Sequence, residues 1–441
     1  MKLTELKIKN YKSLGDIVFS PSNFSAIIGP NASGKSNFAS AISFLTEVYQ
    51  YGLVKAISVK GGFENIAYKK IKRTKSPIEF SIKIKIDYEE LDNLRAFIKF
   101  EKNVDLLYIE FEHIFAFSTN KLNAKSDYSV IFESVKYSEV FSDHRNDIIS
   151  FEKNYNDVKS KYGKNLGKVF ENFKSYFNKI PLRPQSLMIT DFPMLEIIFG
   201  NVLSYLKSFR IYQFNPFKTR IPGIYSPIPI LNQDGENLPI YVNWFKEEHP
   251  SLWINLLNTM RDIIPGLQDI KVDFLHNRTL GLFFIEKGIG KPWISEEVSD
   301  GTILTLSILL GISDPNKEFI LIEEPENSIH PWILRKLVEY FLKIADTKTV
   351  VVTTHSLILI DMLSPDQIWC VYKMDNKSNI KKITELDKML ESDWKNGKTK
   401  ISDYLDMGLI PQAVLNEYSK PEVQKDKIIK ESKRIYKKIK K

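Results

Sequence analysis

The chain has 441 residues, of which 43% are hydrophobic and 26% charged, the proportions of a folded globular protein. This length exceeds one average domain, so we expect a main domain that carries a substantial insertion. The net charge of +8 is concentrated in residues 421–441, where nine Lys or Arg stand against three Asp or Glu. The body is therefore nearly neutral, which argues against a globally basic surface and for a local anionic contact at the tail.

No segment predicts secretion or membrane insertion. Residues 1–12 alternate apolar and charged side chains, as a strand does, and lack the apolar core of a signal peptide. The longest apolar run, residues 303–312, is shorter than the roughly 20 residues of a membrane-spanning helix. We expect a cytoplasmic protein without membrane contact, whose single cysteine, Cys370, is a buried structural thiol.

The first half of the chain predicts a strand, a loop and a helix, followed by a β-rich lobe. The apolar run 24–28 predicts the strand, and residues 37–49 have helical periodicity. Residues 78–151 alternate with period two and predict an antiparallel lobe. Lys-rich stretches that continue to about residue 206 predict a helical insertion.

The second half returns to alternating helices and strands. After a Pro-rich passage, residues 244–264 predict one helix and residues 270–285 predict strands. In the final third, helices are predicted from residue 302 and after residue 331, and strands over 319–322 and 349–353. Such alternation implies a parallel sheet with right-handed crossovers, and hence an α/β fold.

The segment that follows the first apolar strand predicts a phosphate-binding loop. It reads G-P-N-A-S-G-K-S and matches the pattern G-x-x-x-x-G-K-[ST] between a strand and a helix. Backbone N–H groups at the helix start would bind a polyphosphate, Lys35 would neutralise the β and γ phosphates, and Ser36 would ligate Mg²⁺. The predicted nucleotide-binding residues are Gly29, Pro30, Asn31, Ala32, Ser33, Gly34, Lys35, Ser36 and Asn37.

Two acidic residues end the strand of residues 319–322. Ligands bind at the carboxyl ends of parallel strands, so these carboxylates are candidates for chemistry. We predict that Glu323 holds Mg²⁺, directly or through water, and that Glu324 is the general base that orients and deprotonates the attacking water. A solvated acidic turn after a strand would look similar, but the phosphate loop in the same chain favours the catalytic interpretation.

Two further segments complete the candidate site. His355 directly follows the strand of residues 349–353 and would reach the γ phosphate or the water. Ser299, Asp300 and Gly301 precede a predicted helix, where Ser-Asp-Gly is a common helix cap on its own. Their position about 20 residues before the carboxylate strand favours a functional role instead.

These four elements, in this order, resemble the ATPase heads shared by ATP-binding-cassette, SMC and RecF-like proteins. The strings EEPENSIHP, IYQFNPFKTR and LNQDGENLP look most like the RecF-like and overcoming-lysogenisation-defect ATPases. The resemblance covers residues 1–85 and 200–375. It implies a head with a parallel core sheet, an antiparallel β lobe and a helical insertion, and ATP and Mg²⁺ as cofactors. It also implies that Ser299, Asp300 and Gly301 bind the γ phosphate held by a second subunit.

The resemblance further implies a loop that faces the partner subunit, with Glu326, Asn327 and His330 as its contact residues. Glu323 stands where an aspartate is usual, and the glutamine that often follows the first β lobe has no evident counterpart. No D-x-D pair follows His355, so a nuclease domain is not expected. The implied domains are the first part of the head (1–85), the lobe and insertion (86–206), the second part of the head (207–375) and an extension with the basic tail (376–441).

The leading hypothesis is a dimerising ATPase switch in a prokaryotic defence system against phage, acting with a separate toxin or nuclease as effector. This setting comes from the resemblance alone. A DNA-repair or DNA-loading ATPase that clamps DNA is the main alternative, which leaves nucleic acid open as a partner. An energy subunit of a transporter is disfavoured by the insertion of about 200 residues before Ser299, and a GTPase by the lack of an N-K-x-D string.

Overall fold

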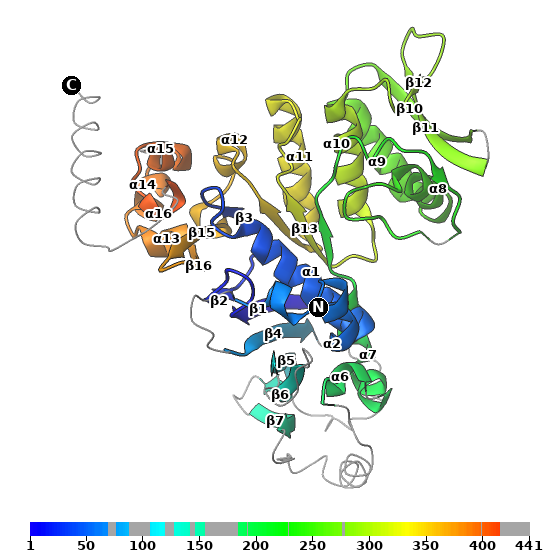
Figure 1. Cartoon of the computed structure of the whole chain (residues 1–441). Helices are drawn as coiled ribbons and strands as arrows, with labels where there is room; N and C mark the ends of the chain where they lie inside the picture. Colours follow the sequence, from blue (N-terminus) through cyan, green and yellow to red (C-terminus); the bar gives the residue numbers. More distant parts are fainter. Residues whose placement is uncertain are drawn as a thin grey trace, which may run out of the picture.

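The computed structural model describes residues 1–68, 76–87, 106–119, 128–141, 146–154, 184–191, 193–227, 229–275, 278–397 and 399–414. Most of the predicted Lys-rich helical stretch and the whole basic tail lie outside these residues. The described chain forms three sheets with helices packed around them (Figure 1).

A six-stranded sheet of order β16-β15-β3-β14-β13-β8 forms the centre of the head. Five of its strands are parallel, and β16 is antiparallel to β15. The strands are β3 (Phe24–Ile28), β8 (Arg210–Tyr212), β13 (Phe319–Glu323), β14 (Thr349–Thr353), β15 (Ile368–Met374) and β16 (Lys377–Lys382). The parallel sheet predicted from the αβ pattern is thus confirmed, and β3, β14 and β13 place the three predicted site segments at one edge.

The central strands are continuous apolar runs because both faces of this sheet are covered. In β13, Phe319 and Leu321 belong to one core cluster while Ile320 and Ile322 belong to the other. The first cluster lies under α1 (Lys35–Tyr51), and the second under α10 (Asp300–Ser313) and α11 (Pro331–Ile344). This two-sided burial fixes the strand ends that carry the candidate site.

A second six-stranded sheet, of order β2-β1-β4-β5-β6-β7, is antiparallel throughout and is the predicted β lobe. Its strands are β1 (Lys2–Lys9), β2 (Asp16–Phe19), β4 (Ile78–Asp87), β5 (Leu106–Thr119), β6 (Tyr128–Phe141) and β7 (Asn146–Asn154). Because β4 pairs with both β1 and β5, the boundary proposed at residue 85 falls inside one strand of a single sheet. The short helices α2 (Leu53–Val59), α3 (Phe63–Ile66) and α6 (Met188–Asp191) and the helix α7 (Pro193–Lys207) accompany this sheet.

A third sheet lies beside α8 (Leu238–Glu248) and α9 (Pro250–Ile263), next to α10. It consists of β10 (Leu267–Phe274), β11 (Thr279–Glu286) and the two-residue strands β9 (Gly223–Ile224) and β12 (Trp293–Ile294). The prediction of one helix over residues 244–264 was wrong: α8 ends at Glu248, His249 lies between the two helices, and α9 starts at Pro250. Proline has no N–H to continue a helix but fits its first turn.

The chain after β14 builds a cluster of short helices beside β15. They are α12 (Leu357–Ile360), the 3₁₀ turn η3 (Pro365–Gln367), α13 (Ile383–Leu386), α14 (Leu390–Lys395), α15 (Ile401–Asp406) and α16 (Pro411–Val414). Since β16 belongs to the core sheet, the boundary proposed at residue 375 cuts a hairpin of that sheet. In the described ranges, no helix combines the length and the apolar character needed to cross a bilayer.

Candidate nucleotide-binding and catalytic site

The phosphate loop joins the buried strand β3 to α1 and depends on two glycines. Gly29 and Gly34 have φ angles of +148° and +118°, which residues other than glycine rarely adopt. A Cβ on Gly29 would lie 2.1 Å from the carbonyl oxygen of Val371, and one on Gly34 would lie 2.3 Å from Ser378 Oγ. The chain therefore passes so close to β15 and β16 that only glycine fits at both ends of the loop.

Hydroxyl and amide groups fix this loop from outside. Ser378 Oγ donates to the carbonyl oxygen of Ser33 at 2.5 Å and lies 2.8 Å from Ser13 Oγ. Asn37 Nδ2 donates to Ser13 Oγ at 2.7 Å, so this predicted site residue supports the loop from within α1. Pro30 is buried, whereas Asn31 and Ala32 are exposed at its tip.

Lys35 lies folded over its own loop. Its Nζ donates to the carbonyl oxygens of Gly29 at 2.8 Å and Pro30 at 3.2 Å, and only 7% of the residue is exposed. Burial lowers the pKa of Lys35, and the carboxylate of Glu324 opposes that shift most strongly among the charges around it. No side chain caps the N-terminus of α1, so its first N–H groups can donate hydrogen bonds to a phosphate beside this ammonium.

The two predicted Mg²⁺ ligands lie together. Glu323, the last residue of β13, is 9% exposed and forms a hydrogen bond with the Ser36 side chain. Burial raises the pKa of Glu323, and the Ser36 hydrogen bond opposes that shift. Hydroxyl and carboxylate oxygens are the hard ligands that Mg²⁺ prefers. Among the described residues no group of three or more His, Cys, Asp and Glu forms a complete metal site, so phosphate and water oxygens would complete the shell.

Glu324 leaves the strand through a left-handed backbone turn. Its φ is +47°, uncommon for a residue with a side chain, and such strain is typical of functional positions. Its N–H donates to the carbonyl oxygen of Thr353 at 2.9 Å, which ties the turn to β14. Asn327 Nδ2 donates to Glu324 Oε2 at 2.9 Å. The carboxylate is thus oriented by its neighbour and acts electrostatically on both Lys35 and His355.

His355 follows β14, the strand between those that carry the phosphate loop and the carboxylates. Its backbone N–H donates to Glu326 Oε1 at 2.6 Å, while its imidazole is exposed. The part of the ring that is buried, and then the charge of Lys35, lowers the pKa of His355. The ring is therefore neutral at pH 7, when one ring nitrogen can accept a hydrogen bond.

Glu326 and its neighbours in the predicted dimer-facing loop point in different directions. Glu326 turns inward, where Oε1 also accepts from Thr354 Oγ1 at 2.9 Å. Asn327 and His330 are exposed, and His330 Nδ1 caps α11 by accepting from the Trp332 N–H at 3.2 Å. Two of the three predicted contact residues are thus accessible to a partner, and Glu326 has an internal role.

The Ser299 segment is both a helix cap and part of the surface formed by that loop. Ser299 Oγ accepts from the Thr302 N–H at 3.1 Å at the start of α10. A Cβ on Gly301 would lie 3.1 Å from the carbonyl oxygen of Ser328, so the two segments touch. Asp300 forms an ion pair with Arg220 at 2.7 Å. No local pattern in the sequence points to Arg220, because its partner is 80 residues away.

A glutamine follows the strand that neighbours the carboxylate strand. Gln213 directly follows β8, whose Tyr212 is aligned with Ile322 in the neighbouring β13. Gln213 is exposed, and it lies level with Glu323 at the carboxyl ends of these two strands. Its signal in the sequence was its place directly after the short apolar pair Ile211 and Tyr212.

Cys370, in contrast, takes no part in this chemistry. It is fully buried in β15, and burial raises the pKa of its thiol to about 12. A thiol that is neutral and enclosed is unreactive.

Residues 24–361 match the family model described as "AAA domain, putative AbiEii toxin, Type IV TA system". The match spans well over half of the chain. The chain belongs to this AAA-domain family. A comparison with curated proteins gives no match.

Several solved SMC head structures are similar to this AAA-domain chain. The SMC head bound to the C-terminal winged-helix domain of ScpA is 15% identical with a TM-score of 0.47, over 86% of this chain and 98% of that one. An SMC head with an extended coiled coil, bound to the C-terminal domain of ScpA and derived from Pyrococcus furiosus, is 14% identical with a TM-score of 0.43, over 88% and 98%. The SMC head of Thermotoga maritima is 13% identical with a TM-score of 0.38, over 87% and 99%.

The AAA-domain match and the sheet order agree with the fold predicted from the sequence. The parallel core sheet carries the phosphate loop after β3, and the antiparallel β lobe packs over α1. The chain is an α/β protein with the architecture of a P-loop ATPase head.

Proposed function

We propose that this AAA-domain protein is a switch ATPase of which two copies bind ATP, close head to tail and reopen after hydrolysis. The observation that carries the proposal is the separation of two half-sites in one chain. The phosphate loop follows β3, whereas Ser299 and Gly301 lie against the loop after β13. In Figure 1, α11 stands between α10 and the β3 end of the sheet. The Ser299 segment is therefore available to the nucleotide of a second copy.

Each half-site has a distinct task. Lys35 and the free N–H groups of α1 would hold the phosphates, with Ser36 and Glu323 on Mg²⁺, which lowers the charge of the phosphate oxygens. Glu324 would accept the proton of the attacking water, and a neutral His355 would orient that water or the γ phosphate. Ser299 and the N-terminus of α10 would bind the γ phosphate from the partner and so complete the site only in the closed dimer.

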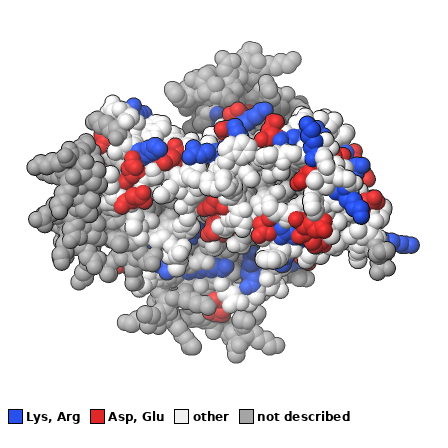
Figure 2. Space-filling view, turned by 90° about the horizontal axis from the view of Figure 1, so that it is seen from above, with Lys and Arg blue, Asp and Glu red and all other residues white. Residues whose placement is uncertain are grey.

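For the biological setting, we propose a cytoplasmic defence system in which the dimer controls a separate effector, a toxin or nuclease. The family description, with its type IV toxin–antitoxin system, supports this setting. A DNA-clamping ATPase is the second candidate, favoured by the nine Lys or Arg in residues 421–441. Figure 2 shows basic and acidic side chains interspersed on the described part of one face, which favours a protein partner for the body.

The variant Glu324→Gln tests the proposal, because it removes the base and keeps the shape of the site. We expect it to bind ATP normally and to lose roughly 10²- to 10⁴-fold in hydrolysis, the usual contribution of a general base. Trapped in the ATP state, it should double its mass in light scattering when ATP is added. A mass that stays monomeric at saturating ATP would contradict the proposed dimer, and near-normal turnover would contradict the role of Glu324.

A further inference from the structure

A tight turn next to the Ser299 segment presents one bare aromatic ring. Phe217 is 76% exposed, the highest value among the large apolar side chains of the described residues. The turn beneath it is rigid: Asn215 Oδ1 accepts from the Phe217 N–H at 2.9 Å, and the Thr219 N–H donates to the Asn215 carbonyl at 3.0 Å. Thr219 itself is fully buried. An exposed ring on a fixed backbone is the form that binding anchors take, because little freedom is lost on contact.

Arg220 attaches this turn to the Ser299 segment. Its Nη1 donates to the carbonyl oxygen of Pro216 at 3.1 Å and lies 2.7 Å from Asp300 Oδ1. Its Nε and Nη2 donate to the carbonyl oxygens of Ser295 at 2.9 Å and Val298 at 2.8 Å. Phe217 is therefore held in a fixed position relative to the residues that would meet the nucleotide of a second copy.

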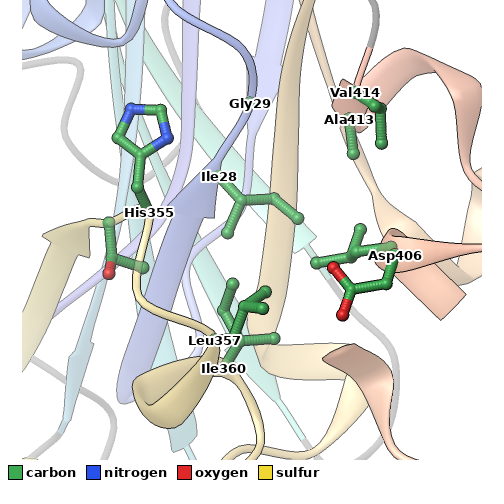
Figure 3. Close-up of a pocket in the computed structure, with 10 residues that line it drawn as sticks. Ile28, Gly29, His355, Leu357, Ile360, Asp406, Ala413 and Val414 are labelled. Atoms are coloured by element: carbon green, nitrogen blue, oxygen red, sulfur yellow. The ribbon is translucent and has the colours of Figure 1, made fainter. Parts of the chain in front are cut away.

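A pocket lined by both apolar and polar side chains flanks the other half-site. It has a volume of about 280 Å³ and begins at Ile28 and Gly29, at the end of β3, next to His355. In Figure 3, Ile28, Leu357 and Ile360 lie between His355 on one side and Asp406 with Val414 on the other. Because α15 and α16 line it and α16 packs on β15, the pocket lies on the β15 side of the phosphate loop.

The sheet order pairs these two features in a head-to-tail dimer. The strands run β15-β3-β14-β13-β8, and the Phe217 turn follows β8, one strand beyond the carboxylate strand. Suppose that a two-fold axis places Ser299 of one copy on the phosphate loop after β3 of the other. The order of elements in the second copy is then reversed, while the distances between them stay the same. The Phe217 turn lies beyond Ser299 in the direction away from the phosphate loop. In the dimer it therefore meets what lies beyond the phosphate loop of the second copy, which is the pocket on the β15 side.

We propose that Phe217 of one copy inserts into this pocket of the second copy when the heads close. This rests on the proposed function, and it names the apolar contact that borders each nucleotide. In this pairing each nucleotide is enclosed by an aromatic anchor on its outer side, which excludes water from the closed site.

The first test compares dimerisation of three proteins that all carry Glu324→Gln. Phe217→Asp should weaken the ATP-dependent dimer by roughly 30-fold or more, as loss of a central aromatic anchor does. It should leave ATP binding to the monomer unchanged, because the Phe217 turn follows β8, and two strands separate β8 from the β3 strand that carries the phosphate loop. Ile254→Asp is the matched control: Ile254 is also exposed, at 57%, but lies on α9. If both variants dimerise as the Glu324→Gln parent does, Phe217 is not an anchor.

The second test asks which surface receives the ring. One Glu324→Gln chain carries Phe217→Cys and another carries Val414→Cys, and the mixture is treated with a short bismaleimide. Cross-linking through native cysteines should be low, because the single native cysteine, Cys370, is buried. We expect a covalent heterodimer that forms only with ATP, and none when Ile254→Cys replaces Phe217→Cys. A yield no higher than that control overturns the contact, whereas a parent that never dimerises overturns the proposed function instead.

Discussion

The carboxylate of Glu326 accepts hydrogen bonds from the backbone N–H of His355 at 2.6 Å and from Thr354 Oγ1 at 2.9 Å. It thereby joins the loop after β13 to the first residues after β14. The other oxygen, Oε2, is buried and has no hydrogen-bond partner among the described residues. Glu326 therefore sets the position of His355 relative to Glu324, two residues earlier in its own loop.

We predict that Glu326→Ala lowers kcat by roughly 10- to 100-fold, the loss expected when a group near the reacting atoms shifts by about 1 Å. ATP affinity should change far less than kcat, because Glu326 hydrogen-bonds to Thr354 and His355 and acts on Lys35 only through its charge. Glu326→Gln is the control, since its amide oxygen can accept both hydrogen bonds. Phosphate-release kinetics measure kcat for both variants. Equal kcat values for Glu326→Ala and Glu326→Gln would show that Glu326 does not position His355.

Lys35→Ala should abolish nucleotide binding. The ammonium lies over the carbonyl oxygens of Gly29 and Pro30, where the β and γ phosphates would sit, and nothing else in the loop carries a full positive charge. Titration with a fluorescent ATP analogue measures the loss. Lys336→Ala, which removes an exposed lysine on α11, should bind ATP as the native chain does. Retained affinity in the Lys35 variant would mean that another cation holds the phosphates.

The pH dependence of stability should carry a contribution from His355. Its pKa is lowered in the folded chain, so between that value and 6.5 the unfolded chain binds more protons. The stability linked to this group is therefore complete above pH 6.5 and is lost as the pH falls below it. Thermal melting at pH 7.5 and 5.5 should show a smaller acid-induced drop in Tm for His355→Gln than for the native chain. An equal drop would contradict the lowered pKa.

The basic tail lies outside the described residues and remains a prediction from the sequence. Ile428, Ile435 and Ile439 recur at helical spacing among lysines, which predicts a basic helix for docking to an acidic protein surface or to nucleic acid. Removing residues 425–441 should weaken that binding, most clearly at low salt, and leave basal ATP turnover intact. Equal binding by the truncated and full chains across the salt range would leave the tail without a docking role.

Local sequence patterns predicted the parts of the site that one segment builds by itself. The phosphate loop needs Gly29 and Gly34 for its backbone, and buried parallel strands show as apolar runs that end at Glu323 and Thr353. Contacts between distant segments leave no such pattern. Gln213 lies level with Glu323 only because β8 pairs with β13, and Arg220 pairs with Asp300 across 80 residues.

The direction in which a side chain points was harder to predict from the sequence than the segment of the site to which it belongs. Glu326 and Asn327 are neighbours with similar polarity, yet the loop turns one inward to His355 and leaves the other exposed. Backbone angles decide such differences, as the φ of +59° at Ser328 illustrates. The helix break at Pro250 was masked by the apolar pattern that continues on both sides of it.

The central claim, that each ATP is enclosed by residues of two copies, is tested most directly by mixing two inactive variants. Lys35→Ala destroys the phosphate loop and keeps Ser299, whereas Ser299→Arg keeps the phosphate loop and blocks the partner-facing segment. Each alone should hydrolyse almost no ATP, since no complete site can form. In a mixed dimer one site combines the intact Lys35 of one chain with the intact Ser299 of the other. We predict that mixing restores turnover to a substantial fraction of the native rate, at most about half, since each mixed dimer carries one complete site of two. Native-like turnover by Ser299→Arg alone, or no recovery on mixing, would contradict the shared site.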